Sequence, residues 1–169
     1  MKINISDKTL SGKQNFSFKE KIEIARQLEK LGVTSIELPQ IDNVKTDTLL
    51  IKTVASFVKN GVISVGAGYT AESLKNAVNS LATAVKPRIR VEVPVSTVGM
   101  EYTCHMKAPK MLETVTELIK EAKNHFDDVE FCAVDATRAE EDFLKDIIIS
   151  AVGAGANTVT VSDNNAVMM

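Results

Sequence analysis

Residues 129–138 read VEFCAVDATR, and this stretch decides between the folds that the rest of the chain allows. An apolar run of strand-forming residues ends in Asp135, Thr137 and Arg138, where the chain turns toward a helix. In barrel enzymes built from alternating strands and helices, the catalytic side chains lie at such strand ends. The residue just before Asp135 is Val134, which carries no acid, base or ligand atom. The residues of this stretch leave open whether it is a catalytic strand or one that has lost its catalytic residue.

The same alternation extends outward in both directions. Short β-branched runs predict strands at 3–6, 35–38, 62–67, 88–95, 129–134 and 158–162. Longer amphipathic segments predict helices at 18–32, 46–61, 70–85, 110–126 and 138–155. Thr70 is the expected N-cap of the third helix, and Gly32, Gly61 and Gly155 are expected at helix C-termini. A strand–helix repeat of roughly 30 residues with short connections predicts an α/β protein with a parallel sheet.

Two architectures fit this pattern: an open doubly wound sheet and a (β/α)8 TIM-type barrel. The chain has neither a GxGxxG after its first strand nor a GxxxxGK[ST], so both common phosphate-binding loops are absent from the sequence. Polar residues recur instead at the carboxyl ends of predicted strands, namely Asp7, Glu37, Ser96 with Thr97, Asp135 and Asp163. That recurrence favours the barrel, because its active-site face is formed by these strand ends.

The strand count is too low for a closed barrel. A (β/α)8 barrel needs eight strands and roughly 250 residues, whereas this chain of 169 residues contains about six predicted strands and five helices. Six strands of a barrel would leave two unpaired edges and an uncovered apolar interior. We therefore expect residues 1–169 to form one partial barrel domain that is a fragment, or that associates as a homodimer or with a complementary chain carrying the remaining strands.

Composition and charge exclude several classes of partner. A net charge of −2 and a pI near 5.8, without a clustered basic stripe, predict no nucleic-acid binding. The N-terminus does not resemble a signal peptide, and no apolar run approaches the roughly 20 residues that span a bilayer. Cys104 and Cys132 form no CxxC pair. A disulfide between them is possible, but two reduced thiols in a cytoplasmic protein are expected.

Four stretches, taken in order, resemble one enzyme family: 2-isopropylmalate synthase, homocitrate synthase and HMG-CoA lyase. They are ISDKTLSGKQ at 5–14 with FSFKEKIEIARQLEKLGVTSIEL at 16–38, VPVSTVGMEYTCHMKAPKMLETVTELIKEAK at 93–123, DDVEFCAVDATRAEEDFL at 127–144 and GANTVTVSDNNAVMM at 155–169. The resemblance implies a (β/α)8 barrel that binds a divalent metal, Mg²⁺ or Mn²⁺, and joins or splits carbon–carbon bonds with acyl-CoA. The synthases of this family add the acetyl group of acetyl-CoA to a 2-oxo acid.

The chain departs from the family's catalytic motifs at three places. The first-strand motif is D-x-T-L-R-D-G-x-Q, in which the Arg-Asp pair supplies an oxyanion partner and a metal ligand. The residues that match it are Asp7, Thr9, Leu10, Gly12 and Gln14. Ser11 stands where the Arg-Asp pair would be, and Val134 stands where the fifth strand would carry a glutamate. The two histidines of a seventh-strand H-x-H would lie beyond Met169.

These departures leave two functions open. The first is an acyl-CoA-dependent synthase of the homocitrate or 2-isopropylmalate type, as a fragment or subunit that is not competent alone. The second is a non-catalytic relative that regulates or scaffolds an active homologue. By the resemblance, Asp7 is a candidate metal ligand, and Asp7 and Gln14 are candidate catalytic residues. An ordinary strand-end turn is the alternative role of Asp7.

Four further residues are candidates for substrate binding: Glu37, Thr97, Arg138 and Asp163. Glu37 occupies a family rim position on the second strand, and the hydroxyl of Thr97 follows the fourth. The alternative role of Glu37 is that of a satisfied polar group at the barrel mouth, and that of Thr97 is loop capping. Arg138 together with Asp135 also fits a local N-cap arrangement for the helix that follows, and the family motif around Asp163 is altered by Asn164.

Overall fold

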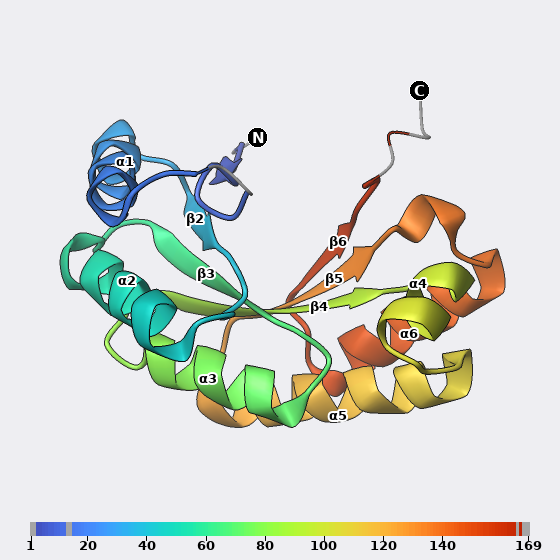
Figure 1. Ribbon diagram of the computed structural model, residues 1–169. Helices are drawn as coiled ribbons and strands as arrows, with labels where there is room; N and C mark the ends of the chain where they lie inside the picture. The colour runs from blue at the N-terminus through green and yellow to red at the C-terminus, as the bar shows by residue number, and fades with distance from the viewer. Residues whose placement is uncertain (1–2, 13–14, 165, 167–169) are drawn as a thin grey trace. The chain divides into compact units, whose positions relative to one another are not determined.

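The computed structural model describes residues 3–12, 15–164 and 166. The chain divides into two compact units, which consist of residues 1–67 with 75–89 and of residues 68–74 with 90–169. Among the described residues, six strands form one sheet in the order β1-β2-β3-β4-β5-β6 (Figure 1). No helix in the described ranges is both long and apolar enough to span a bilayer.

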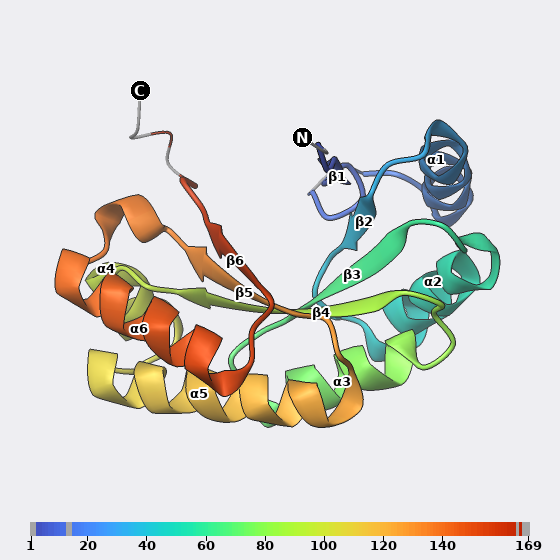
Figure 2. The same ribbon diagram turned by 180° about the vertical axis from the view of Figure 1, so that it is seen from behind.

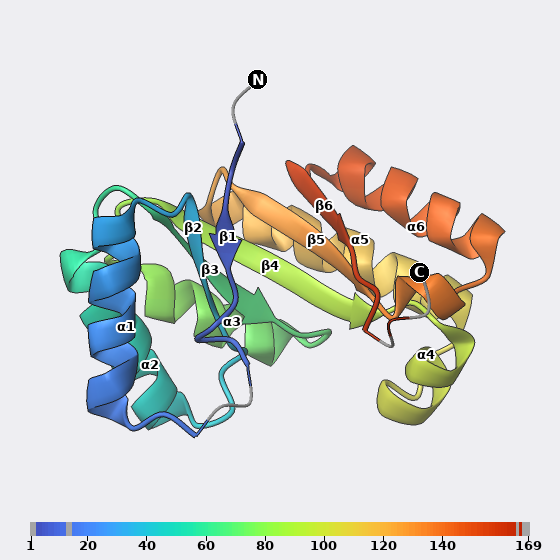
Figure 3. The same cartoon turned by 90° about the horizontal axis from the view of Figure 1, so that it is seen from above.

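The first unit contains three strand–helix pairs and the beginning of a fourth strand. Its elements are β1 (Ser6–Asp7), α1 (Phe18–Leu31), β2 (Ser35–Leu38), α2 (Val44–Phe57), β3 (Val62–Ala67), most of α3 (Ala71–Leu81) and the first residues of β4 (Pro87–Pro94). The strands pair in parallel, with Ser6 opposite Ser35 and Glu37 opposite Ser64. Helices α1 and α2 pack side by side, as seen from above in Figure 3. This register brings the side chains after β1 next to those at the end of β2.

The second unit begins within β4 and repeats the same arrangement. Its elements are α4 (Thr97–Thr103), α5 (Ala108–His125), β5 (Val129–Val134), the short 3-10 helix η1 (Ala136–Arg138), α6 (Glu141–Ala154) and β6 (Thr158–Val161). Strands β5 and β6 are parallel neighbours, with Cys132 opposite Thr160. Helix α5 packs against both β5 and α6 (Figure 2). The loops after β4, β5 and β6 consequently lie at one end of this unit.

The strand order confirms the predicted fold class. In a doubly wound sheet the order reverses about the first strand, whereas the strands of a (β/α)8 barrel follow one another in chain order. Here β1 to β6 are neighbours in chain order and each described pairing is parallel. The described part of the chain therefore has an α/β fold of the TIM-barrel type with six of the eight strands.

Several element boundaries differ from the sequence prediction. Helix α2 ends at Phe57 instead of Gly61, because the carboxylate of Glu29 accepts the backbone N–H groups of Lys59, Asn60 and Gly61. Helix α6 begins at Glu141, three residues later than predicted, because η1 occupies the preceding segment. Helix α4 has no counterpart among the predicted helices. Strand β5 has the predicted bounds, and the predicted helix 70–85 is confirmed as α3 but ends at Leu81.

Buried polar residues occupy one face of the strands. Alternate residues of β2 to β5 are apolar and almost fully buried, among them Ile36, Val65, Val91 and Phe131. The intervening positions carry Ser35, Glu37, Ser64, Arg90 and Glu130, each no more than 6% exposed. In the second unit Arg90 Nε donates to Glu92 Oε1 at 2.6 Å, and Thr160 Oγ1 donates to Glu130 Oε1 at 2.7 Å. The expectation of an apolar interior is wrong at these positions. Side chains alternate between the two faces of each strand, and the face opposite the apolar residues carries these buried polar ones.

Candidate active site

The end of β1 carries Asp7, the candidate metal ligand and catalytic residue. Its Oδ1 accepts the backbone N–H of Thr9 at 3.0 Å and its Oδ2 accepts the Thr9 hydroxyl at 3.2 Å. These bonds form a local turn, which is the structural role that an aspartate at a strand end commonly has. The carboxylate is half-buried and retains lone pairs beyond these two bonds. The other candidate catalytic residue, Gln14, lies outside the described residues.

Glu37, at the end of β2, is buried within a chain of hydrogen bonds. Ser35 Oγ donates to Ser6 Oγ at 2.6 Å, and Ser6 Oγ donates to Glu37 Oε1 at 2.6 Å. The ammonium of Lys8 lies 3.6 Å from Glu37 Oε2, and the Lys8 side chain is 57% exposed. The buried negative charge is thus compensated by a cation that faces solvent, as a buried carboxylate requires.

The sequence prediction missed Ser6 and Lys8. They are two residues apart, so along an extended segment their side chains project from the same face. Since β1 pairs with β2, that face brings both residues to Glu37. Strand alternation together with the parallel pairing would have identified them. Neither predicted role of Glu37, as a substrate contact or as a satisfied polar group, included its ion pair with Lys8.

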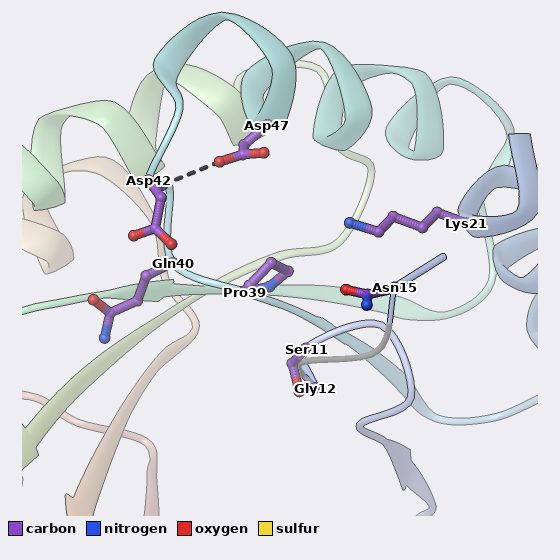
Figure 4. Close-up of a pocket in the computed structure, with 8 residues that line it drawn as sticks. All are labelled: Ser11, Gly12, Asn15, Lys21, Pro39, Gln40, Asp42 and Asp47. Atoms are coloured by element: carbon purple, nitrogen blue, oxygen red, sulfur yellow. Dashed lines mark hydrogen bonds between the residues drawn. The ribbon is translucent and has the colours of Figure 1, made fainter. Parts of the chain in front are cut away.

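A pocket of about 500 Å³ lies between the loops that follow β1 and β2 (Figure 4). Ser11, which stands in place of the family's Arg-Asp pair, lines it together with Asn15 and Gln40. Lys21 extends into it from α1, a contribution that the sequence prediction missed. The carboxylate of Asp47 on its wall accepts the N–H of Asp42 at 3.0 Å. The pocket therefore combines a cation, amides and carboxylates at the carboxyl ends of two strands.

In the second unit, Asp135 joins the loops after β4 and β5. It is 6% exposed, and its Oδ2 accepts the hydroxyl of Ser96 at 2.6 Å. Arg138 donates through Nε to Oδ1 at 2.8 Å and through Nη2 to Oδ2. This hydrogen bonding and the negative charge of Asp135 raise the pKa of Arg138 above its ordinary value. Asp135 is therefore the centre of a bidentate ion pair that a serine extends.

The N-cap role expected for Asp135 is wrong. Its backbone has φ 58°, in the left-handed region, and its side chain makes no capping bond to η1. Helix α6 begins later, with Glu140 at its N-cap. The Asp135 carboxylate accepts hydrogen bonds from Ser96, in the loop after β4, and from Arg138 instead of from the backbone of the following turn. Aspartate is among the residues that tolerate the left-handed conformation best.

The remaining candidates lie around the same loops. Asp163 Oδ1 accepts the hydroxyl of Thr137 at 3.0 Å, and Asn164 Oδ1 accepts the N–H of Asp135 at 2.9 Å. These two hydrogen bonds join the loop after β5, which carries Arg138, to the loop after β6, which carries Asp163. Thr97 is exposed at the start of α4, whose N-cap is Ser96. Ser96 Oγ also accepts the N–H of Gly99 at 3.1 Å, so this hydroxyl both caps α4 and donates to Asp135.

The donors in the described residues do not by themselves form a metal site. No group of three or more His, Cys, Asp or Glu side chains in this part of the chain is arranged to hold a metal ion. Mg²⁺ and Mn²⁺ prefer about six oxygen or nitrogen donors. Asp7 offers one carboxylate, so further ligands would have to come from elsewhere. Cys104 and Cys132 are both buried and are not joined in a disulfide, and burial raises the pKa of the Cys104 thiol.

Comparison with known proteins identifies the family. The HMGL-like family model matches residues 3–169. The chain is 35% identical over 167 residues to a 2-isopropylmalate synthase of Geobacillus sp., covering 96% of this chain and 32% of that protein. It is 34% identical over 151 residues to 2-isopropylmalate synthase 1 of Caldanaerobacter subterraneus, covering 88% of this chain and 38% of that protein. The chain belongs to the HMGL-like family.

Solved structures show the same fold. The HMG-CoA lyase of Bacillus subtilis superposes with a TM-score of 0.74 at 11% identity, over 92% of this chain and 54% of that one. The hydroxymethylglutaryl-CoA lyase of Pseudomonas aeruginosa gives a TM-score of 0.72 at 14% identity, over 95% of this chain and 55% of that one. The chain spans about a third of the length of the synthases that it matches.

Proposed function

We propose that this chain supplies six strands of a synthase that joins acetyl-CoA to a 2-oxo acid, and that it is not competent alone. The observation that carries the proposal is the polar rim of the first unit: a buried Glu37 held by Ser6 and Lys8, beside a pocket at the ends of β1 and β2. Such strand ends form the active face of barrel enzymes. Membership of the HMGL-like family and the 2-isopropylmalate synthase relatives support the same reaction class.

The reaction makes defined demands on the rim. A base removes a proton from the thioester methyl group, and the resulting carbon attacks the keto carbon, which becomes an alkoxide. Water then cleaves the thioester and releases CoA as a thiol. A divalent metal, where bound, would supply Lewis-acid polarisation of the carbonyl. Within this chain, Glu37 orients Lys8, whose ammonium is available to the negative charge of a substrate.

Two features of the second unit support the proposal that the remaining strands are required. Val134 offers no acid at the end of β5, and Arg138 uses Nε and Nη2 to pair with Asp135. Among the described residues no complete set of metal ligands is present. We propose that Asp7 is one ligand and that a complementary segment supplies the others. Glu37, Thr97, Arg138 and Asp163 remain proposed substrate contacts within that completed barrel.

A second function, a non-catalytic regulatory or scaffolding role, is favoured by one specific observation. Arg138 and Asp135 satisfy each other's charge, with Ser96 as a third member, so this part of the rim is built for rigidity. In that case the chain would bind an active homologue without contributing a reacting group. Both functions require association with another polypeptide.

Product identification tests the proposal and separates these two functions. The chain would be mixed with a polypeptide that carries the H-x-H strand and the rest of the barrel, with acetyl-CoA, 2-oxoisovalerate and Mg²⁺ or Mn²⁺. We expect mass spectrometry to detect the condensation product in the mixture and in neither polypeptide alone. Complex formation without product would support the non-catalytic role and contradict the synthase.

A further inference from the structure

Helix α1 carries an open apolar stripe on the surface of the first unit. Ile24, Leu28 and Leu31 follow one another at spacings of four and three residues, so their side chains lie on one face of the helix. This α1 stripe lines a hollow of about 530 Å³ together with three polar residues, Glu23, Gln27 and Lys30. All the lining residues belong to α1, so the hollow lies on the surface of this one helix.

The packing of α1 within its own unit uses other faces of the helix. Helix α2 lies on one side of α1 (Figure 3). Ala25 is fully buried, and the Arg26 guanidinium lies 4.7 Å from the centroid of the Phe57 ring on α2. In the α1 stripe, by contrast, Leu31 is 77% exposed and the other two residues are half-buried. A contiguous apolar face that remains accessible commonly marks an interaction surface.

Opposite charges flank the α1 stripe toward its two ends. Glu23 precedes Gln27 and Lys30 follows it, and both charged residues are exposed. Gln27 Nε2 donates to Glu23 Oε1 at 2.6 Å, which holds the carboxylate beside the middle of the stripe. Glu23 and Lys30 are seven residues apart, which corresponds to about two helical turns. The helix therefore offers a negative group near the start of its stripe and a positive group near the end.

This arrangement is complementary to itself when two copies of α1 lie antiparallel. A two-fold axis beside Gln27 brings Ile24 of one copy opposite Leu31 of the other and places Leu28 near its own counterpart. The same axis brings Glu23 of each copy to Lys30 of the other, which makes two symmetric ion pairs. In a parallel arrangement each charged residue would lie level with its own counterpart, so these attractive pairs would be lost.

We propose that the α1 stripe is a docking surface for a second copy of this chain, and that the two copies pack α1 against α1 in antiparallel orientation. The apolar residues supply the attraction, and the two Glu23–Lys30 pairs select the orientation. An interface confined to one helix face is small, so the dimer is weak and its population depends on concentration. The inference does not rest on the proposed function, since no residue assigned to substrate or metal lines the hollow.

Charge-reversal variants test the pairing, each in an Ile149→Lys background so that the exposed apolar residues of α6 do not contribute. In a dimer of Glu23→Lys, position 23 of each copy would repel Lys30 of the other, and Lys30→Glu would create the converse repulsion with Glu23. We expect each variant alone to dimerise at least about tenfold more weakly than the Ile149→Lys chain. An equimolar mixture of the two variants regains both attractive pairs in the heterodimer, so we expect its association to return to the level of the Ile149→Lys chain. Sedimentation equilibrium over a concentration series measures all four samples.

Matched substitutions in the same background test the apolar contact. Leu31→Lys should weaken dimerisation by about tenfold or more, because it places a charge in the contact. Leu49→Lys changes a residue that is 58% exposed on α2 outside the hollow and should leave dimerisation unchanged. Lys19→Glu reverses an exposed charge of α1 outside the hollow and should also have no effect. A thermal unfolding transition for each variant shows that it is folded.

The mixture of the two charge-reversal variants decides the proposal. Association that is restored in the mixture and weak in each variant alone supports the antiparallel contact, since this contact brings position 23 of one copy to position 30 of the other. A monomeric Ile149→Lys chain, or a mixture that associates no better than its components, would overturn the proposal. Protection of the α1 stripe from hydrogen exchange by a polypeptide carrying the remaining strands, without protection by a second copy, would also overturn it and assign the hollow to that polypeptide.

Discussion

Ser96 and Asp135 lie 39 positions apart in the chain, and the hydroxyl of Ser96 donates a 2.6 Å hydrogen bond to the carboxylate of Asp135. The same carboxylate receives Arg138, and the Asp135 backbone holds a left-handed conformation between β5 and η1. This relationship fixes the loop after β4 against the loop after β5. The rim of the second unit is therefore held rigid by its own polar groups.

Removing the Asp135 carboxylate should destabilise the fold. Asp135→Ala deprives Ser96 and Arg138 of their acceptor. It also places alanine, which tolerates a left-handed backbone less well than aspartate, at φ 58°, and the two effects together should lower the free energy of unfolding by about 2–3 kcal/mol. Asp135→Asn keeps a side-chain oxygen acceptor, and asparagine tolerates the left-handed backbone, so the free energy of unfolding should fall by less. Urea denaturation checks both. Equal stability of Asp135→Ala and the parent chain would contradict the role of this network.

Two glycine-to-alanine substitutions should change the free energy of unfolding in opposite directions. A Cβ on Gly99 would lie 2.7 Å from Pro94 Cβ and 2.9 Å from Ser96 Oγ, so Gly99→Ala should push Ser96 from its position and cost about 1–3 kcal/mol. Gly153 lies inside α6 with nothing within 4 Å of its added Cβ. Gly153→Ala should stabilise the chain by about 0.5–1 kcal/mol. Thermal unfolding measures both effects. A stabilising Gly99→Ala would show that Gly99 is not packed tightly against Pro94 and Ser96.

Glu29 should make stability depend on pH. Burial alone would raise the pKa of Glu29, but the hydrogen bonds from Asn60, Lys59 and Gly61 outweigh it and hold the pKa below its ordinary value of 4.5. A depressed carboxyl pKa contributes stability above the unfolded-state pKa, and that contribution is lost as pH falls through the folded-state pKa. We expect Glu29→Gln to cost about 1 kcal/mol at pH 7, after allowing for solvent screening, and less below pH 4.5.

The matched control for Glu29 is Glu23→Gln, on the exposed surface of the same helix. Urea midpoints at several pH values should differ between parent and Glu29→Gln near neutrality and converge in acid. For Glu23→Gln, the difference in urea midpoint between the variant and the parent chain should stay constant across pH. A constant offset for Glu29→Gln down to the acid limit would mean that its hydrogen bonds do not depend on its ionisation.

Self-association is expected from the apolar side chains that remain exposed at the end of the second unit. Ile149 and Val152 on α6 are 69% and 53% exposed, and Val161 on β6 is 55% exposed. Exposed strands and apolar helix faces favour association. Sedimentation of the pure chain should show a dimer or larger species, and Ile149→Lys should shift it toward the monomer. A monomeric parent chain at high concentration would contradict this expectation.

Local patterns predicted the parts of the fold that depend on nearby residues. Strand β5 has the predicted bounds, because its run of apolar residues ends in clear turn signals. Gly32 and Gly155 are helix C-caps with positive φ, as predicted from their positions after amphipathic segments. The strand order was predicted from the strand–helix alternation together with the missing phosphate-binding motifs and the polar residues at the strand ends. These features need only short-range information and the general preference for parallel neighbours in such folds.

Long-range contacts decided what the sequence could not predict. The end of α2 depends on Glu29, about thirty residues earlier in the chain, and the role of Asp135 depends on Ser96. Lys21 reaches a pocket whose other walls come from the loops after β1 and β2. Its helical periodicity placed it on α1 without indicating what it faced. Side-chain partners that only the tertiary structure brings together have no signature in a single sequence.

The most direct test of the central claim is thiol release from acetyl-CoA by the 169-residue chain alone. The assay would supply 2-oxoisovalerate or 2-oxoglutarate and millimolar Mg²⁺ or Mn²⁺. We predict no release above the protein-free rate, because Ser11 and Val134 replace the family's catalytic residues and the described donors form no complete metal site. Turnover by the chain alone, abolished by heat denaturation, would contradict the claim and show that other residues of this chain carry out the reaction.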